Sequence, residues 1–170
     1  MRSQITPEAE VLKNEDVVRL FDAYADDLYR FAVYYSGSKH DAEDIVQDVF
    51  LKLLGDHVEY KPGKEKTYLF TMTANKCRDY LRSASRKTGV DLESCENELQ
   101  YFDDFNERNR AVFDELMNLD YQFRMPIYLH YYAGYSYKDI AGILKISESA
   151  VAVRINRGKA LMKIGLEEYL

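Results

Sequence analysis

The chain has little of the chemistry that builds disulfide frameworks, metal centres or membrane spans. Its 170 residues include only two cysteines, Cys77 and Cys95, and three histidines, and none of these shows the spacing of metal ligands. No apolar run is long enough to cross a membrane, and no signal peptide is recognisable. We therefore expect a cytoplasmic protein with no structural metal and no cofactor. A redox switch between the two cysteines is left as an open alternative.

Proline and strand-like patterns are also scarce. The sequence has three prolines and no alternating apolar–polar runs, whereas apolar residues recur every three or four positions over much of its length. This periodicity favours an all-α fold. No nucleophile–base pair, metal cluster or phosphate-binding loop is recognisable, so the sequence favours a binding protein over an enzyme.

The net charge of −6 conceals an alternation along the chain. Residues 8–59 carry thirteen acidic and five basic side chains, whereas residues 60–90 carry two acidic and eight basic ones. Residues 91–107 carry seven acidic side chains and no basic one, and residues 134–164 carry two acidic and six basic ones. Basic segments can follow nucleic-acid phosphates, whereas acidic segments would be repelled and require a different partner. Solvated helix faces are the alternative explanation for any single segment.

The clearest motif lies in residues 134–163. Ser136 stands three residues before Asp139, which is the spacing of a capping box, and Ser147 can cap a second helix. Apolar residues follow each cap at helical spacing, and Ile146 can fill the angle between the two helices. This pattern is typical of a helix-turn-helix, whose second helix enters the DNA major groove. An ordinary helical hairpin is the alternative.

Two helices are predicted near the start of the chain. Asn14 can cap the first, which runs from about residue 15 to residue 35 and ends at Gly37. The second begins after Ser38 and runs to about residue 54, with apolar rows on one side and an acidic face on another. Acidic residues in its first turn suit the helix dipole, but that role cannot explain Asp48, two turns further on.

A basic loop and a basic helix come next. Residues 55–66 are predicted to form a loop with a turn at Pro62–Gly63, and a helix follows over residues 67–85. Lysines and aromatic residues alternate there, which suits contact with phosphates and stacking on unpaired bases. For Tyr68 and Phe70 a place in the core is at least as good an explanation.

The remaining segments are a linker and a final helical unit. Residues 86–106 are predicted to be a linker, because they are acidic and have weak periodicity. The last unit begins with a helix near Asn106, and Pro126 is predicted to open the next helix, which leads to Gly134. With the helix-turn-helix this unit forms a small four-helix domain.

Three stretches in this order resemble bacterial RNA polymerase sigma factors of the extracytoplasmic-function (ECF) group. Residues 41–53, DAEDIVQDVFLKL, resemble the family's polymerase-binding helix, and residues 68–82 resemble its promoter-melting helix. Residues 134–154 resemble its C-terminal helix-turn-helix. The resemblance covers about residues 15–165. It implies an N-terminal arm (1–14), sigma domain 2 (15–87), a flexible acidic linker (88–106) and sigma domain 4 (107–170).

The resemblance implies core RNA polymerase, promoter DNA and an anti-sigma factor as partners, with no membrane insertion and no catalysis. The residues at the polymerase-binding positions are Asp41, Glu43, Asp44, Gln47 and Asp48. The −10 element would be melted and read by Tyr60, Lys61, Lys64, Lys66, Asn75, Lys76, Asp79 and Arg82. The −35 element would be contacted by Ser136, Lys138, Ser147, Ser149, Ala152, Val153, Arg154, Asn156 and Arg157.

The chain departs from the family pattern at several positions. Tyr68 replaces a usual tryptophan, and Lys145 replaces the usual glycine in the turn. A left-handed backbone at Lys145 would cost on the order of 1 kcal/mol. The recognition helix has Ala150, Ala152 and Val153 where polar residues are common, and such side chains contact a thymine methyl group without hydrogen bonding. We therefore expect a thymine-rich or shape-dependent −35 element.

Two other functions remain open at this point. A stand-alone helix-turn-helix regulator would bind duplex DNA without polymerase, although it would leave the acidic helix and the basic loop without a purpose. A protein-interaction module that sequesters a partner is the third possibility.

Overall fold

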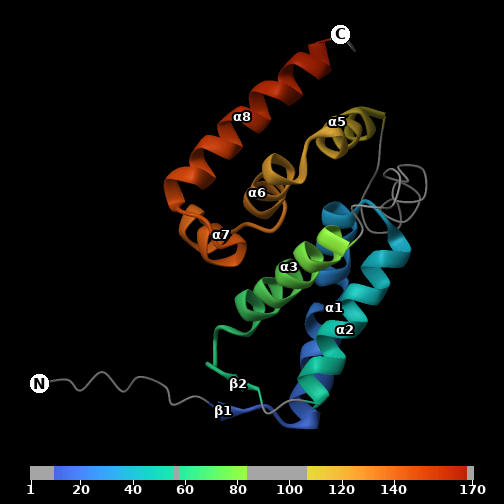
Figure 1. Ribbon diagram of the computed structural model, residues 1–170, viewed down its shortest axis with the longest axis vertical. Coiled ribbons are helices and arrows are strands. Elements are labelled where there is room, and N and C mark those ends of the chain that lie inside the picture. The colour runs from blue at the N-terminus through green and yellow to red at the C-terminus, as the bar shows by residue number, and fades with distance from the viewer. Residues whose placement is uncertain (1–9, 56–57, 84–106, 168–170) are drawn as a thin grey trace, which may run out of the picture.

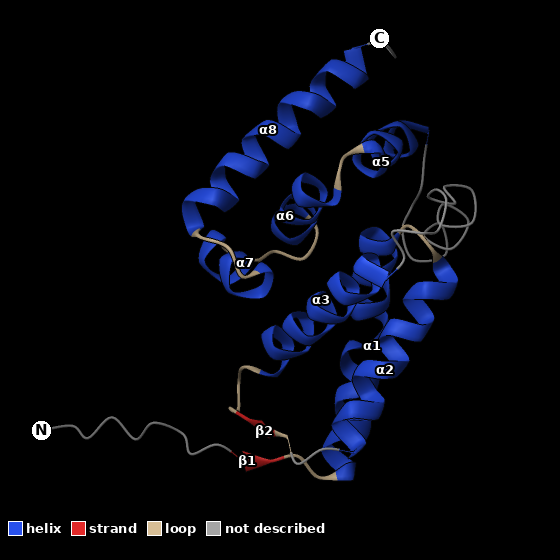
Figure 2. Cartoon of the chain, viewed as in Figure 1, coloured by secondary structure: helices blue, strands red, loops and turns tan. Residues whose placement is uncertain are grey.

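The structure is a computed structural model that describes residues 10–55, 58–83 and 107–167. The elements in this part of the chain are β1 (Glu10–Val11), α1 (Asn14–Ser36), α2 (Lys39–Gly55), β2 (Glu59–Tyr60), α3 (Glu65–Ser83), α5 (Glu107–Asn118), α6 (Tyr121–Tyr131), α7 (Tyr137–Leu144) and α8 (Glu148–Glu167). The predicted all-α fold is confirmed, with a two-residue antiparallel strand pair added (Figure 2). The predicted linker over residues 88–106, Cys95 and most of the N-terminal arm lie outside the described residues.

The helices form two units that lie against each other (Figure 1). The first unit contains α1, α2 and α3 with the strand pair, and the second contains α5 to α8. Within the first unit, α1 packs along α2 and α3, and within the second, α8 packs across α6, α7 and α5. The domain boundaries predicted at residues 15–87 and 107–170 stay predictions.

Local capping signals set most helix ends. Gly37 ends α1 in the left-handed conformation, with φ 68°, as predicted from the residue type. The predicted cap at Asn14 is wrong, because Asn14 is the first residue of α1 and Lys13 occupies the cap position. The Asp16 carboxylate accepts a hydrogen bond from the Lys13 amide at 3.0 Å, so the helix start is stabilised from inside the first turn.

The predicted helix start at Pro126 is also wrong. Helix α6 begins at Tyr121, because the Asp120 carboxylate caps it by accepting a hydrogen bond from the Gln122 amide at 3.0 Å. Pro126 lies inside this helix and removes one backbone donor. The carbonyl that loses its partner belongs to the exposed Gln122, which water can reach.

The helix-turn-helix forms as predicted. Ser136 caps α7 by accepting a hydrogen bond from the Asp139 amide at 3.2 Å, and Ser147 accepts one from the Ala150 amide at 3.1 Å. Lys145, between the helices, is left-handed with φ 56° and ψ 48°. The half-buried Ile146 packs on the core at the turn, as its position predicts.

The two units share an aromatic and polar interface. Phe31 of α1 contacts Phe70 of α3 and Tyr128 of α6, with ring centroids 5.3 and 6.0 Å apart.

Two arginines cross the interface in opposite directions. Arg78 of α3 donates to the carbonyl of Leu144, the last residue of α7, at 3.3 Å. Arg124 of α6 donates to the carbonyl of Tyr35 near the end of α1, at 3.2 Å. Each positive charge therefore stabilises the negative end of a helix in the other unit.

Candidate functional site

The acidic face of α2 is the first candidate surface. Glu43, Asp44, Gln47 and Asp48 are all exposed, and the side chains of Asp44 and Asp48 are 56% and 61% exposed. The structure therefore leaves these four predicted polymerase-binding residues available on one helix. None of them fills the core, so their side chains stand at the surface where a partner can reach them.

Asp41 differs from the other four residues of this set. Its carboxylate accepts a hydrogen bond from the Tyr80 hydroxyl of α3, and its amide donates to Ser38 Oγ at 3.3 Å. It is only partly exposed. Asp41 therefore has a visible structural role, tying α2 to α3 and closing the start of α2.

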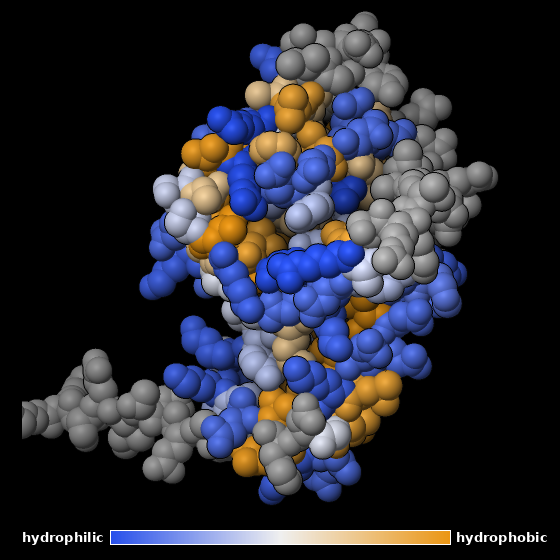
Figure 3. Space-filling model, in the orientation of Figure 1, coloured by the Kyte–Doolittle hydropathy of each residue, from blue (hydrophilic) through white to orange (hydrophobic). Residues whose placement is uncertain are grey.

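Beside the acidic face lies an apolar groove that the sequence did not reveal. The groove has a volume of about 470 Å³ and runs between the start of α1 and the end of α2. It is lined by Val17, Val18, Phe21, Glu43, Val46, Gln47, Phe50, Leu51 and Leu54. Figure 3 shows apolar surface near the lower end of the first unit, where these helix ends lie.

Several large apolar side chains of this groove are exposed to solvent. Phe21 and Leu54 are 50% and 51% exposed, although both lie at the helical spacing of apolar residues. The sequence signal for this groove is the width of the apolar stripe on residues 45–54. Two parallel rows of apolar side chains there are wider than one neighbouring helix can cover. An exposed apolar surface beside charged residues marks a contact site for another protein.

The second candidate surface is the basic loop between β2 and α3. Lys61 and Lys64 are exposed and close a tight turn, in which the Lys64 amide donates to the Lys61 carbonyl at 3.0 Å. Gly63 has φ 84° at the third position of this turn, as a type II turn requires. Lys66 is half-buried, with Nζ 5.9 Å from the Phe70 ring centre and 5.8 Å from that of Tyr135 in the second unit.

Tyr60, the first residue predicted for this surface, is not available in the same way. Its side chain is only 8% exposed and packs inward from β2. Tyr60 therefore anchors the base of the loop, and the exposed contact groups of the loop are the lysines that follow it. Burial of this ring could not be read from the sequence, because it depends on which face of a two-residue strand meets the core.

The predicted DNA-contacting residues of α3 lie next to the acidic face of α2. Asp79 and Arg82 are exposed, and Asn75 and Lys76 are half-buried. Lys76 Nζ lies 4.0 Å from Asp48 Oδ2. A shallow groove of about 410 Å³ between α2 and α3 is lined by residues of both predicted sets, including Asp44, Asp48, Lys76 and Asp79. The structure therefore brings the predicted polymerase-binding and −10-binding residues together.

The third candidate surface is α8. Ser149, Val153, Asn156 and Arg157 are exposed, while Val151 and Ile155 on the opposite side are buried. Ala152 and Arg154 are half-buried, and Arg154 faces a pocket that also contains Arg78 of α3. Ser136, Lys138 and Ser147 are exposed at the starts of α7 and α8, where the positive end of a helix dipole lies. The exposed face of α8 has the geometry of a recognition helix.

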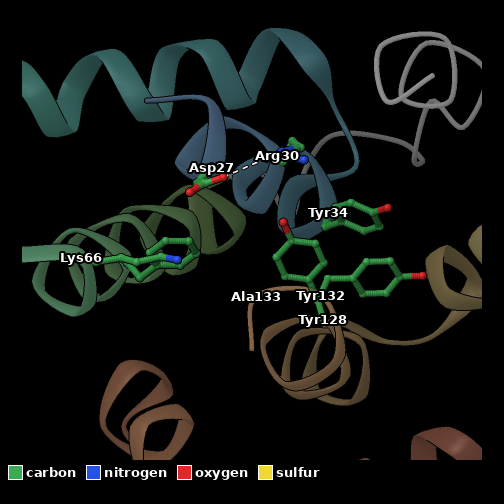
Figure 4. A pocket seen from close by; sticks show the side chains of 8 residues that line it. Asp27, Arg30, Tyr34, Lys66, Tyr128, Tyr132 and Ala133 are labelled. Atoms are coloured by element: carbon green, nitrogen blue, oxygen red, sulfur yellow. Dashed lines mark hydrogen bonds and ion pairs between the residues drawn. The ribbon is translucent and has the colours of Figure 1, made fainter. Parts of the chain in front are cut away.

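A pocket of about 150 Å³ lies where the two units meet (Figure 4). Asp27 and Arg30 of α1 form an ion pair at 2.8 Å on its wall, and Lys66 lies across from the tyrosines of α6. Burial raises the pKa of two interface tyrosines to about 12. Tyr35 lies in α1, next to the pocket residue Tyr34, and Tyr135 lies just before α7. Both rings are therefore neutral near pH 7.

The described residues include one cysteine, Cys77, and three features of this part of the chain bear on metal, membrane and redox chemistry. No group of three or more histidine, cysteine or acidic side chains among them could hold a metal ion. None of the helices described is long and apolar enough to cross a membrane. Cys77 is fully buried, and burial raises its thiol pKa, so this thiol is poorly suited to redox exchange.

Two family models match this chain, and they match it in consecutive segments. Residues 20–87 match Sigma-70 region 2, and residues 110–162 match Sigma-70 region 4. The chain is 30% identical over 163 residues to the ECF RNA polymerase sigma factor SigL of Mycobacterium tuberculosis, covering 88% of each protein. It is 26% identical to SigX of Bacillus subtilis, covering 87% of this chain and 82% of SigX. It also matches SigE of Mycolicibacterium smegmatis at 26% identity, covering 60% of that longer protein.

Solved structures show the same arrangement of helices. CnrH, solved in complex with the cytosolic domain of CnrY, aligns with a TM-score of 0.64 and 25% identity over 92% of this chain and 90% of its own. The fold also matches that of RpoE in its complex with the anti-sigma factor NepR from Bartonella quintana, with a TM-score of 0.64, 21% identity, and 90% and 98% coverage. With both sigma regions in order and a relative matched over most of its length, the chain belongs to the ECF RNA polymerase sigma factors.

Proposed function

We propose that this protein binds core RNA polymerase and directs it to specific promoters. One observation carries the proposal: the exposed acidic face of α2 lies directly beside the basic side chains of α3. A polymerase-binding surface and a DNA-melting surface on one rigid unit would position promoter DNA relative to the enzyme. The second unit adds a helix with an exposed face suited to duplex DNA.

The polymerase contact combines charge and apolar surface. Glu43, Asp44 and Asp48 supply the acidic part and Gln47 a polar amide, and the groove beside them supplies apolar area from both α1 and α2. Exposed charges steer association and fix orientation, whereas buried apolar area contributes most of the binding free energy. Asp41 contributes indirectly by holding α2 against α3.

The first unit acts on the −10 element. Lys61 and Lys64 meet the phosphates of the separated strand, and the loop receives an unpaired base, whose unstacking costs a few kcal/mol that contacts have to offset. Lys66, Asn75, Lys76, Asp79 and Arg82 continue this surface along α3. Tyr60 serves as the buried anchor of the loop.

The second unit reads the −35 element as duplex. Ser149, Asn156 and Arg157 supply polar contacts to base edges or phosphates, with Ala152 and Val153 against thymine methyl groups. Ser136, Lys138 and Ser147 hold phosphates at helix starts, and Arg154 lies at the edge of this surface. This set favours a thymine-rich or shape-dependent element. A guanine-rich consensus selected from random sequences would contradict that assignment.

An anti-sigma factor is a further proposed partner. RpoE, whose fold this chain shares, was solved in complex with the anti-sigma factor NepR. The exposed apolar groove and the acidic face of α2 offer such a partner the same contacts that the polymerase needs, so the two would compete.

Charge reversal on α2 tests the polymerase contact. We expect the double substitution Asp44→Lys and Asp48→Lys to abolish binding to core polymerase, because it opposes the charge complementarity while both side chains are exposed and outside the core. Binding can be measured by size-exclusion chromatography or fluorescence anisotropy with purified core enzyme.

The matched control reverses two charges elsewhere. Glu15→Lys with Asp26→Lys changes the net charge equally on exposed positions of α1 that do not line either groove beside α2. This control should bind core enzyme normally. Unimpaired binding by the α2 variant, or equal loss in both variants, would refute the proposed docking face.

A stand-alone regulator is the second candidate, since α8 alone has a face suited to duplex DNA. Gel mobility separates the two functions. A regulator would bind promoter duplex tightly without polymerase, whereas a sigma factor would bind it strongly only together with the core enzyme.

A further inference from the structure

The strand pair lies at the base of the proposed base-capturing loop. Glu10 pairs with Tyr60 and Val11 with Glu59, in antiparallel register, and the Leu12 amide donates to the Val58 carbonyl at 3.0 Å. The loop turn begins one residue after this pair, at Lys61. Residues 10–12 therefore hold the strand from which the loop emerges.

The two faces of β2 show how it is anchored. Val58 and Tyr60 are buried and Glu59 is exposed, which is the alternation of a strand with one face on the core. These side chains fix the depth of β2 and favour one register, because a slip by one residue would expose Val58 and Tyr60. The backbone hydrogen bonds to β1 hold the strand in that register.

β1 is in turn fixed to the first unit. It leads through the half-buried Leu12, which packs against the core, directly into α1 at Asn14. The first turns of α1 supply Val17 and Val18 to the apolar groove beside α2. One continuous segment, residues 10–18, therefore joins the base of the loop to the proposed polymerase-binding groove.

We propose that β1 is a positioning element for promoter melting, which sets where the Lys61–Lys64 turn meets the unpaired base of the −10 strand. This inference rests on the proposed function, because it assigns a task to the loop that the function requires. β1 itself touches no DNA. It acts through the register of β2, and the chemistry it serves is recognition of a single-stranded base by the loop.

A pair of proline substitutions tests the backbone bonds specifically. Hydrogen-bonded and non-hydrogen-bonded pairs alternate in an antiparallel ladder, so Leu12–Val58 is a bonded pair and Val11–Glu59 is not. Leu12→Pro removes a ladder donor, whereas Val11→Pro removes an amide that lies outside the ladder. Leu12→Ala keeps the donor and controls for the lost side chain.

The readout is strand opening by the reconstituted holoenzyme. Permanganate reactivity of unpaired thymines reports opening of a duplex promoter, and transcription from a premelted template of the same sequence reports function without the opening step. We expect Leu12→Pro to lower opening of duplex DNA about tenfold relative to Leu12→Ala. A tenfold change corresponds to roughly 1.4 kcal/mol, which is about what one backbone hydrogen bond that holds the loop in place contributes. On the premelted template Leu12→Pro should stay within about twofold, and Val11→Pro should behave as wild type on both.

A cross-link provides a rescue. A non-hydrogen-bonded antiparallel pair brings its Cα atoms to about 4.5 Å, which suits a disulfide. Val11→Cys with Glu59→Cys, placed in the Leu12→Pro protein and oxidised, should restore opening on duplex to near the Leu12→Ala level.

The outcomes separate this inference from the function beneath it. Equal opening by Leu12→Pro and Leu12→Ala, or no rescue by the disulfide, would overturn the positioning role. If Leu12→Pro lost activity equally on both templates, or no longer bound core polymerase, β1 would serve only to stabilise the fold. That result would also overturn the positioning role. Failure of the wild-type holoenzyme to open or transcribe any promoter would instead contradict the proposed function.

Discussion

Lys145, in the turn of the helix-turn-helix, is the only non-glycine residue with a positive φ in the part of the chain that the structure describes. A side chain with a Cβ atom is strained there by on the order of 1 kcal/mol. Lys145 is exposed, and its amide donates to the Ala141 carbonyl. The strain therefore comes from the backbone conformation of an exposed residue.

Substitution of this residue by glycine should stabilise the protein. We expect Lys145→Gly to raise the free energy of unfolding by about 0.5–1 kcal/mol, because relief of strain exceeds the added entropy of the unfolded chain. Lys145→Ala, which keeps the Cβ atom, should give no such gain. Thermal or urea denaturation followed by circular dichroism measures both, and a glycine variant no more stable than the alanine variant would contradict this explanation.

Residues whose roles are local were predictable, and residues whose roles depend on burial were not. The caps Ser136 and Ser147 and the terminator Gly37 act within four residues, so their sequence context was sufficient. Asp41 and Tyr60 occupy family positions expected on the surface, yet one bonds to α3 and the other is buried. Contacts between residues 39 positions apart leave no trace in a local pattern.

At the scale of the elements, the crossing of α8 over α6 depends on a glycine. A Cβ atom at Gly158 would lie 2.6 Å from Ile127 Cδ1 and 3.3 Å from Phe123 Cβ. Gly142 in α7 has nothing within 4 Å of the same position. The two helical glycines therefore have different reasons for their presence: one permits close packing, and the other only weakens its helix.

Alanine at these two positions should have opposite effects. We expect Gly142→Ala to stabilise the protein by up to about 1 kcal/mol through helix propensity. We expect Gly158→Ala to destabilise it by about 1 kcal/mol, because overpacking against α6 exceeds the same propensity gain. Urea denaturation of both variants measures the difference. Equal stabilisation by both would show that α6 yields easily at this crossing.

Helix existence was predictable throughout the described chain, but the cap of α1 and the start of α6 were not. Periodicity located α1, α2, α3 and the helix-turn-helix within a few residues of their observed bounds. The start of α6 was misplaced because Pro126 is a strong start signal, and the cap at Asp120 competes with it and prevails. The β1–β2 pair was missed because two residues are too few for an alternating pattern.

At the scale of the whole molecule, the two units are packed together. Aromatic rings and two arginine–carbonyl hydrogen bonds join α1 and α3 to α6 and α7. The −10 and −35 elements lie about 25 base pairs apart, which is ~85 Å of duplex at 3.4 Å per pair. Units in direct contact cannot reach both elements, so promoter binding under the proposed function requires them to move apart.

Ionisation of the interface tyrosines should loosen this arrangement at high pH. The pKa values of Tyr35 and Tyr135 are raised from 10.0 to about 12 by burial. An unfolded tyrosine ionises near pH 10, whereas the buried rings stay neutral up to about pH 12. The contribution of the neutral rings to the free energy of unfolding is therefore complete below pH 10, and it is lost as the pH rises to about 12. The loss is at most roughly 2–3 kcal/mol for each tyrosine.

Urea denaturation at pH 8, 10 and 11.5 measures this dependence. Tyr35→Phe and Tyr135→Phe should each make stability less sensitive to pH above 10, because phenylalanine keeps the ring and removes the ionisable hydroxyl. Unchanged pH dependence in both variants would show that other groups control alkaline unfolding.

The central claim is that this chain directs RNA polymerase to promoters, and run-off transcription tests it most directly. Purified core polymerase and this protein would be incubated with genomic DNA, and the transcript starts would be mapped by sequencing. The proposed function predicts discrete starts that core enzyme alone does not produce, with a shared −10 motif and a thymine-rich or shape-defined −35 element. Transcripts no more numerous or specific than those of core enzyme alone would contradict it.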